Sequence, residues 1–273
     1  MRVRVCVGML PILFAALPFA SLSYDYYCLR HGQSLANVAG VISSDPTQAC
    51  IQHGLSDEGW SQAEAAAETV VSEAARIGAD CVAIVSSDLR RAWQTASALR
   101  AGLLAAGIRV WPESGGLPLE ERALRERSFG ELSGQSDKLY ADVWVEDAKS
   151  ATHETFGCES VLSVQERGRG VVERLERRDD LASATAKAAA AKGGRGGGKV
   201  MVVLVAHGDV LQILQTAFAN VDMREHRSLD HLPTATLRRL MLAAPEAWTT
   251  FDDGKVSNKW RDSALWPDTS LTS

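Results

Sequence analysis

The 273-residue chain is poor in the features that mark disulfide-stabilised secreted proteins and nucleic-acid-binding proteins. It has five cysteines and no Asn-x-Ser/Thr sequon, and Cys28 and Cys81 lie inside apolar, strand-like runs, so no disulfide framework is indicated. The formal net charge is -5, which gives no support for binding to nucleic acid or to an anionic membrane surface. A negatively charged small partner therefore has to meet a local group of basic side chains.

Metal-binding motifs are also missing. The sequence has no Cys-x-x-Cys pair, and four histidines follow no known zinc-binding spacing: His53, His153, His226 and His231. The sequence therefore predicts no metal site.

Long apolar runs are scarce. A transmembrane helix needs about 20 apolar residues, and the run near the N-terminus is shorter than this. The run from Val5 to Ala20 follows Arg2 and Arg4 and is followed by small residues up to Ser23, which is the layout of a secretory signal peptide. We predict that residues 1–23 are a signal peptide and that no stable membrane insertion remains after its removal. The alternative is a mis-assigned start or an extra buried strand. The chain enters the secretory pathway in the first case and is cytoplasmic in the second.

What the sequence does contain is an alternation of strand and helix patterns. Strands are predicted over residues 24–29, 81–85, 108–111, 200–205 and 235–242, and helices over 56–77, 87–104, 137–149, 159–178 and 209–220. Alternation of this kind predicts an α/β fold, a three-layer sandwich with a mostly parallel central sheet and helices on both faces. Residues 32–54 are predicted as one long loop. In such sheets the ligand lies outside the carboxyl ends of the strands.

The length and the 46% apolar content suit a single globular domain, which we place at residues 24–245. Residues 182–199 are rich in Ala, Lys and Gly and are predicted as a low-complexity insertion with too few apolar groups to pack. Residues 246–273 show little periodicity and are predicted as a C-terminal tail.

Arginine and histidine residues stand directly after three of the predicted strands. Arg30 and His31 follow the first strand, Arg91 follows the second beyond a serine pair, and His207 follows the fourth. An arginine guanidinium holds phosphate with a planar fork of donors, and a neutral imidazole is a nucleophile near pH 7. Because strand carboxyl ends meet at one edge of a parallel sheet, these residues predict one pocket for phosphoryl transfer through a phosphohistidine.

Further residues complete a series of motifs in a fixed order. They are Arg30-His31-Gly32-Gln33-Ser34 with Asn37, Leu55-x-x-x-Gly59-x-x-Gln62-Ala63, Ser86-Ser87-x-Leu89-x-Arg91-Ala92-x-Gln94-Thr95-Ala96, Leu124-x-Glu126-x-x-Phe129-Gly130-x-x-x-Gly134, Gly157-x-Glu159-Ser160 and Val205-x-His207-Gly208. Together they resemble the histidine phosphatase superfamily, also called the phosphoglycerate mutase-like family, over residues 24–240. The resemblance implies a phosphoglycerate mutase-like fold and a small phosphorylated substrate.

The motifs assign chemical roles under this resemblance. His31 is the nucleophile, and Arg30, Arg91 and His207 stabilise the charge of the transferred phosphoryl group. Asn37 donates a neutral hydrogen bond to phosphate, and Gly208 opens a helix whose first N–H groups face the anion. No metal and no cofactor are expected, because side chains supply the positive charge.

Glu126 is the candidate proton donor for the leaving oxygen, because phosphate nearby favours its protonated form. Asp209 is the rival, since the acid phosphatase branch of the superfamily has an aspartate directly after its second histidine. Here Gly208 stands between them, which favours Glu126.

Three functions remain open from the sequence. A metal-independent phosphomonoester hydrolase with a His31 intermediate is favoured, because a Trp-x-Asp element common in cofactor-dependent phosphoglycerate mutases is missing after Asn37. A mutase-type phosphotransferase is the alternative, since Arg125 and Arg127 could hold a second phosphate. A non-catalytic binding or scaffold protein on the same fold is the third possibility, although the candidate catalytic residues are all present.

Overall fold

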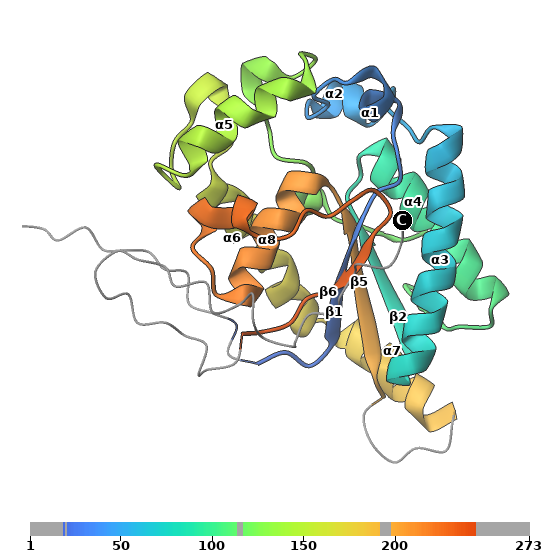
Figure 1. The fold of residues 1–273 in the computed structure, drawn as a ribbon. Helices are drawn as coiled ribbons and strands as arrows, with labels where there is room; N and C mark the ends of the chain where they lie inside the picture. The colour runs from blue at the N-terminus through green and yellow to red at the C-terminus, as the bar shows by residue number, and fades with distance from the viewer. Residues whose placement is uncertain (1–18, 20, 114–116, 192–197, 244–273) are drawn as a thin grey trace, which may run out of the picture.

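The structure, a computed structural model, describes residues 19, 21–113, 117–191 and 198–243, which contain a six-stranded sheet. Figure 1 labels four of its strands, β1, β2, β5 and β6. The strand order is β3-β2-β5-β1-β6, and β4 pairs with the end of β2 beyond β3. The strands are β1 (Asp25–Arg30), β2 (Cys81–Ser86), β3 (Val110–Trp111), β4 (Leu119–Glu120), β5 (Val200–Ala206) and β6 (Leu237–Arg239). Only β6 runs antiparallel to its neighbour among these strands, so the predicted, mostly parallel sheet is confirmed.

Helices connect the strands and cover the sheet. The α-helices are α1 (Leu35–Ala39), α2 (Pro46–Ala49), α3 (Asp57–Ile77), α4 (Arg90–Ala105), α5 (Tyr140–Asp147), α6 (Val161–Glu176), α7 (Asp179–Ala191) and α8 (Gly208–Ala219). Short 3₁₀ helices are η1 (Arg122–Leu124), η2 (Gly130–Leu132), η3 (Asp137–Leu139), η4 (Thr155–Gly157) and η5 (Met223–Ser228).

Alternating side chains of β1 separate two cores, one on each face of the sheet. Tyr26 and Cys28 belong to the core under α6, α7 and α8, whereas Tyr27 and Leu29 belong to the core under α3 and α4. Successive strand residues point to opposite faces, so a sheet covered on both sides needs apolar residues at every position. Figure 1 shows α3 on one side of the sheet and α6 and α8 on the other. The predicted three-layer sandwich is therefore confirmed.

The parallel register brings the ends of β1, β2 and β5 to one edge of the sheet. Arg30 lies opposite Ala206, and Ser86 lies opposite Val205. The residues that come after these three strands therefore meet at this edge, as the sequence predicted.

The prediction that residues 182–199 form an unpacked insertion is wrong for residues 182–191, which belong to α7. Leu181, Ala184 and Ala188 are buried in the same core as β1 and α8. Their spacing of three and four residues places them on one helix face, and the small alanine side chains suffice to cover the sheet. Residues 192–197 of the predicted insertion lie outside the described residues.

The predicted loop at residues 32–54 contains the short helices α1 and α2. The Ser34 side chain accepts from Asn37 N, and the Asn37 side chain accepts from Ser34 N, so α1 begins with a capping box. Asp45 caps α2, with Pro46 at its first position. Polar residues that look like loop signals are therefore caps here.

Helix α4 begins at Arg90, later than the start at residue 87 that the sequence predicts. The Ser87 hydroxyl accepts from Leu89 N at 3.2 Å, and Asp88 forms an ion pair with Arg125. Both side chains are thus used at the edge of the sheet and not to cap the helix.

Most of the predicted signal peptide, residues 1–18 and residue 20, lies outside the described residues, as do residues 244–273 with the predicted tail. Phe19 lies against Phe218 of α8, with ring centroids 4.8 Å apart, and Leu22 packs on the same core. Within the described part of the chain, no helix is long and apolar enough to cross a membrane.

The turn after β1 lies unusually close to the first turn of α3. A Cβ atom on Gly59 would lie 2.0 Å from Gln33 O, and one on Gly32 would lie 2.4 Å from Gly59 O. The Gln62 side chain accepts from Gln33 N at 2.9 Å. Glycine is therefore required on both sides of this contact, which fixes the backbone next to His31.

We expect Gly59→Ala to lower the free energy of unfolding by about 1–3 kcal/mol, because the added methyl group overpacks the contact. Helix propensity alone predicts the opposite sign, a gain of up to about 1 kcal/mol. Gly170→Ala in α6 is the matched control, since its Cβ would meet only the far end of the Arg174 side chain. Urea unfolding measures both variants, and a Gly59→Ala protein as stable as the wild type would contradict the close approach.

Candidate active site

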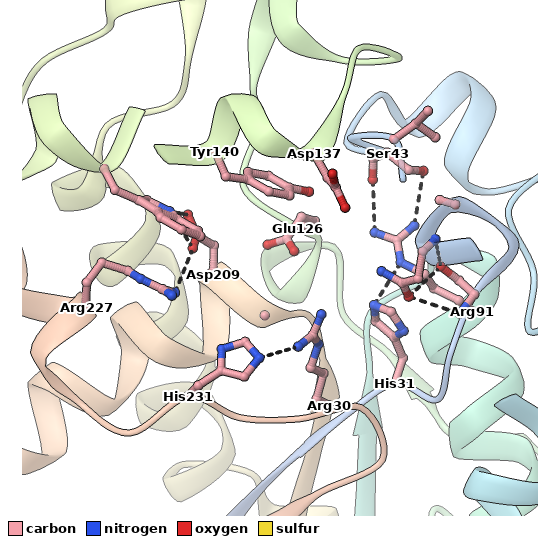
Figure 2. A pocket seen from close by; sticks show the side chains of 16 residues that line it. Arg30, His31, Ser43, Arg91, Glu126, Asp137, Tyr140, Asp209, Arg227 and His231 are labelled. Atoms are coloured by element: carbon pink, nitrogen blue, oxygen red, sulfur yellow. Dashed lines mark hydrogen bonds and ion pairs between the residues drawn. The ribbon is translucent and has the colours of Figure 1, made fainter. Parts of the chain in front are cut away.

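A cavity of about 380 Å³ opens at the edge of the sheet where β1, β2 and β5 end (Figure 2). Six of the seven residues predicted from the sequence line it: Arg30, His31, Asn37, Arg91, Glu126 and Gly208. The seventh, His207, lies next to His31, with the two ring centroids 5.1 Å apart. Among the described residues, no three His, Cys, Asp or Glu side chains are grouped so that they could hold a metal ion.

His31 is 3% exposed, and its ring is fixed by two hydrogen bonds. Nδ1 lies 2.7 Å from Gly32 O, so Nδ1 carries the proton and donates to this carbonyl. Nε2 then keeps its lone pair and accepts from Arg91 Nε at 3.0 Å. Burial, followed by the charges of Arg91 and Arg30, holds the His31 pKa well below its usual value of 6.5. The ring is therefore neutral, with its nucleophilic nitrogen beside a guanidinium group.

Arg91 and Arg30 come from different elements and are held by neutral acceptors. Arg91, in the first turn of α4, donates from Nη2 to Ser43 O at 2.9 Å and from Nη1 to Ser43 Oγ at 3.3 Å. Arg30, at the end of β1, donates from Nη1 to Leu232 O at 2.9 Å and contacts His231 Nε2 at 3.1 Å. The buried Arg30 Nε has no hydrogen-bond partner among the residues that the structure describes. Neither of these hydrogen-bond sets contains a carboxylate.

His207 is fully buried, and its ring centroid lies 5.1 Å from that of His31. Its Nε2 contacts Ser87 Oγ at 2.8 Å, whereas its buried Nδ1 has no hydrogen-bond partner in the described part of the chain. Burial, followed by Arg91, holds the His207 pKa well below 6.5, so the ring is neutral. A Cβ on Gly208 would lie 3.5 Å from the Arg30 guanidinium carbon, so the start of α8 runs beside this arginine.

The two candidate acids lie close together but differ in their contacts. Glu126 Oε1 accepts from Arg127 N at 3.0 Å and from Val210 N at 3.3 Å. Burial, followed by the charge of Asp209, raises the Glu126 pKa. A proton donor near neutral pH needs such a raised pKa.

Asp209 is instead surrounded by donors. Trp144 Nε1 donates to its carboxylate at 3.1 Å, and Arg127 and Arg227 lie 3.5 and 3.9 Å from it. These contacts favour Glu126 over Asp209 as the acid.

Asn37 lines the cavity from α1. Its Oδ1 accepts from both Ser34 N and Ser34 Oγ, at 3.0 and 2.8 Å. Because the backbone N–H of Ser34 needs an acceptor, the amide orientation is determined, and the NH₂ group is left to donate to a ligand.

The chain is similar in sequence to known proteins. A family model for the histidine phosphatase superfamily (branch 1) matches residues 26–250. The chain belongs to this superfamily. A glucosyl-3-phosphoglycerate phosphatase of Mycobacterium tuberculosis is 32% identical over 221 residues, which cover 78% of this chain and 82% of the relative. The Mycolicibacterium vanbaalenii protein of the same name is 31% identical over 198 residues, covering 69% of this chain and 71% of the relative.

Solved structures agree with the sequence relatives. The mycobacterial glucosyl-3-phosphoglycerate phosphatase in complex with VO3 aligns with a TM-score of 0.56 at 27% identity, covering 79% of this chain and 90% of that chain. The complex of the same phosphatase with inorganic phosphate aligns with a TM-score of 0.55 at 25% identity, covering 83% and 100%. The phosphoglycerate mutase-like fold expected for this histidine phosphatase is therefore confirmed.

The suggestion that Arg125 and Arg127 could hold a second phosphate is wrong, because neither lines the cavity. Arg127 is 0% exposed and donates to both carboxylate oxygens of Asp147 at 2.7 and 2.8 Å. Arg125 forms a bidentate ion pair with Asp88. Both arginines of this phosphatase therefore bind aspartates outside the cavity lining.

Sequence reasoning missed several residues that line the cavity: Ser43, Asp137, Tyr140, Trp144, Arg227 and His231. Tyr140 and Trp144 are four residues apart in a predicted helix, and a shared face was a usable signal. The others come from loops and 3₁₀ segments, where no periodicity indicates which side chain turns inward.

We expect Arg127→Ala to destabilise the protein by about 3–5 kcal/mol, because it leaves the buried Asp147 carboxylate without its guanidinium partner. Arg125→Ala is the control, and we expect a cost of at most about 1 kcal/mol, since that ion pair is partly exposed. Chemical denaturation of the two variants gives both values. If both variants lost the same amount of unfolding free energy, the difference in burial between the two ion pairs would not determine their contribution to stability.

Proposed function

We propose that this histidine phosphatase is a metal-independent phosphomonoesterase that acts on a small phosphorylated substrate through a phosphohistidine at His31. The observation that carries the proposal is the His31 ring, whose Nδ1 proton is held by Gly32 O while the unprotonated Nε2 lies 3.0 Å from the Arg91 guanidinium. Membership of the superfamily supports phosphatase activity.

Two displacements make up the proposed reaction. His31 Nε2 attacks phosphorus, and the bond to the ester oxygen breaks as Glu126 gives its proton to that oxygen. Water then attacks the phosphorus of phospho-His31, Glu126 takes the proton from this water, and the P–N electrons return to Nε2. Inorganic phosphate leaves, and both side chains regain their starting states.

Positive charge for the phosphoryl oxygens comes from Arg30 and Arg91. Phosphoryl transfer depends mainly on positioning and on charge stabilisation of these oxygens, and guanidinium forks suit them. In this proposal Arg91 Nε moves from His31 Nε2 to a phosphoryl oxygen as phosphorus approaches. The unpartnered Arg30 Nε and His207 Nδ1 and the Asn37 NH₂ group supply further donors.

The mutase alternative is disfavoured by the commitment of Arg125 and Arg127 to Asp88 and Asp147. A scaffold role is disfavoured because Arg30, His31, Arg91 and Glu126 line one cavity, with the His207 ring next to that of His31. The relatives that match most of the chain are named glucosyl-3-phosphoglycerate phosphatases. We therefore propose a phosphorylated glycerate derivative as the substrate type to examine first.

Phosphate release from a panel of phosphomonoesters in EDTA tests the proposal. We expect turnover by the wild type and a loss on the order of 10³-fold or more in His31→Ala, which lacks the nucleophile. Acid-labile, alkali-stable protein phosphorylation should be trapped in the wild type and not in the variant, as a phosphoramidate requires.

Stabilisation of His31→Ala by inorganic phosphate in a thermal scan serves as the control that its cavity is intact. Absence of release by the wild type, or equal release by both proteins, would contradict the phosphohistidine mechanism. Loss of wild-type activity in EDTA that added metal restores would contradict metal independence.

The pH dependence is set by the two shifted groups. His31 is reactive when neutral, so activity falls only as pH drops through its lowered pKa, well below 6.5. Glu126 donates when protonated, so activity falls as pH rises through its raised pKa. We expect Asp209→Asn to move the alkaline limb of kcat/KM to lower pH, because it removes one cause of the raised Glu126 pKa.

Glu131→Gln is the control. It removes an exposed carboxylate from the chain segment that follows Glu126 and should leave the alkaline limb in place. The kcat/KM profile reports the free enzyme, and substrate ionisation is common to all three proteins. An unmoved alkaline limb in Asp209→Asn would argue against Glu126 as the acid.

A further inference from the structure

The cavity carries another arginine, away from His31, that the proposed phosphoryl transfer does not use. Arg227 comes from η5 and lines the cavity with its side chain 31% exposed. Its guanidinium carbon lies 3.7 Å from the centroid of the Trp144 ring on α5. Figure 2 shows Arg227 beside Asp209, on the far side of Arg30 and His231 from His31. Stacking on Trp144 holds the guanidinium plane and leaves its edges open.

The hydrogen bonds of Arg227 leave one edge of the guanidinium free. Nη1 donates to Gln212 Oε1 at 2.6 Å and lies 3.9 Å from Asp209 Oδ1. Among the residues that the structure describes, no protein acceptor bonds to its Nε or Nη2, and neither of these atoms is buried. In this same protein the Nε and Nη2 atoms of Arg125 and Arg178 bind a carboxylate in bidentate fashion. The free edge of Arg227 is the same pair of donors.

The negative charge of Asp209 lowers the affinity of Arg227 for anions, but Asp209 does not occupy the Nε and Nη2 donors. Asp209 also accepts from Trp144 Nε1 and lies 3.5 Å from Arg127, so Arg227 shares this carboxylate with two other groups. Arg227 thus keeps its two donors while part of its charge is balanced. We therefore expect the guanidinium group of Arg227 to select a ligand with two oxygens in one plane, and to depend less on charge attraction alone.

The free edge lies near the proposed phosphate end of the cavity. His231 contacts Arg30 Nη1 at 3.1 Å, and Arg227 is close enough to Arg30 and to His231 to affect both electrostatically. One small molecule can therefore reach Arg30 with its phosphate and Arg227 with a second group.

We propose that Arg227 forms a carboxylate subsite, so that this enzyme prefers phosphomonoesters of hydroxy acids over esters of the same size that lack the carboxylate. The proposal rests on the proposed function, because it names the substrate feature that the phosphatase site selects. Trp144 and Gln212 hold the guanidinium in place, and the carboxylate binds Nε and Nη2.

Two substrates that differ only at this group test the subsite. D-3-phosphoglycerate and sn-glycerol 1-phosphate share their skeleton and their configuration at C2, and a carboxylate in the first replaces a hydroxymethyl group in the second. We expect the wild type to favour 3-phosphoglycerate about 10- to 100-fold in kcat/KM, the range for losing charge-assisted hydrogen bonds. Arg227→Met, whose side chain still packs on Trp144, should bring this ratio close to 1.

Arg224→Met is the matched control, because Arg224 lies on the same 3₁₀ helix but binds Asp222 and is not among the residues that line the cavity. It should leave the substrate ratio unchanged. Arg227→Lys keeps the charge and loses the planar fork, so we expect an intermediate ratio, and it replaces Arg227→Met if that variant does not fold.

p-Nitrophenyl phosphate separates this proposal from the proposed function. Hydrolysis of this ester with a wild-type substrate ratio near 1 overturns the subsite and leaves the phosphatase reaction standing. A high wild-type ratio that survives both Arg227 variants overturns the role of Arg227. No hydrolysis of any ester by the wild type overturns the proposed function itself.

Discussion

The close approach of the turn after β1 to the first turn of α3 is the constraint on which the active site depends. Gly59 and Gly32 have no Cβ where the two backbones meet, and Gln62 accepts from the turn's own amide. The carbonyl of Gly32 is thereby placed beside His31 Nδ1 at 2.7 Å. A backbone contact that looks purely structural thus decides which nitrogen of His31 holds a proton. In a neutral imidazole only the other nitrogen can attack phosphorus.

The arginines of this chain divide into two groups according to what they bind. Arg30 and Arg91 donate to carbonyl, hydroxyl and imidazole groups, and neither forms a direct ion pair with a carboxylate of the described residues. Arg125 and Arg127 bind aspartates directly. Burial of a charge without an ion-pair partner is unfavourable, and Arg30 and Arg91 both line the cavity, where a bound phosphate group would supply that partner. Where a sequence shows many arginines, their hydrogen-bond partners separate binding groups from structural ones.

Residues placed by regular structure could be predicted from the sequence, whereas residues placed by tertiary contacts could not. Residues at strand ends, such as His31 and His207, were predictable because parallel strands share an edge. Arg227 was not, because it comes after α8 on a short 3₁₀ segment and turns inward only where α5 presents Trp144. Helix α7 was missed for a different reason: its buried face consists largely of alanine, which composition does not distinguish from unpacked, low-complexity chain. Periodicity at positions 181, 184 and 188 was the available signal.

One carboxylate links the acid to the far end of the cavity. Asp209 raises the pKa of Glu126 and lies 3.9 Å from Arg227, so both ends of a bound substrate would lie within reach of its charge. An Asp209 that acted as the acid would have to give up its contacts with Trp144 and two arginines. As a neighbour of the acid it keeps them and still favours protonated Glu126. The arrangement therefore fits the proposed role of Glu126, the carboxyl group with fewer cationic contacts, as the proton donor, with Asp209 as the neighbouring charge that favours its protonated form.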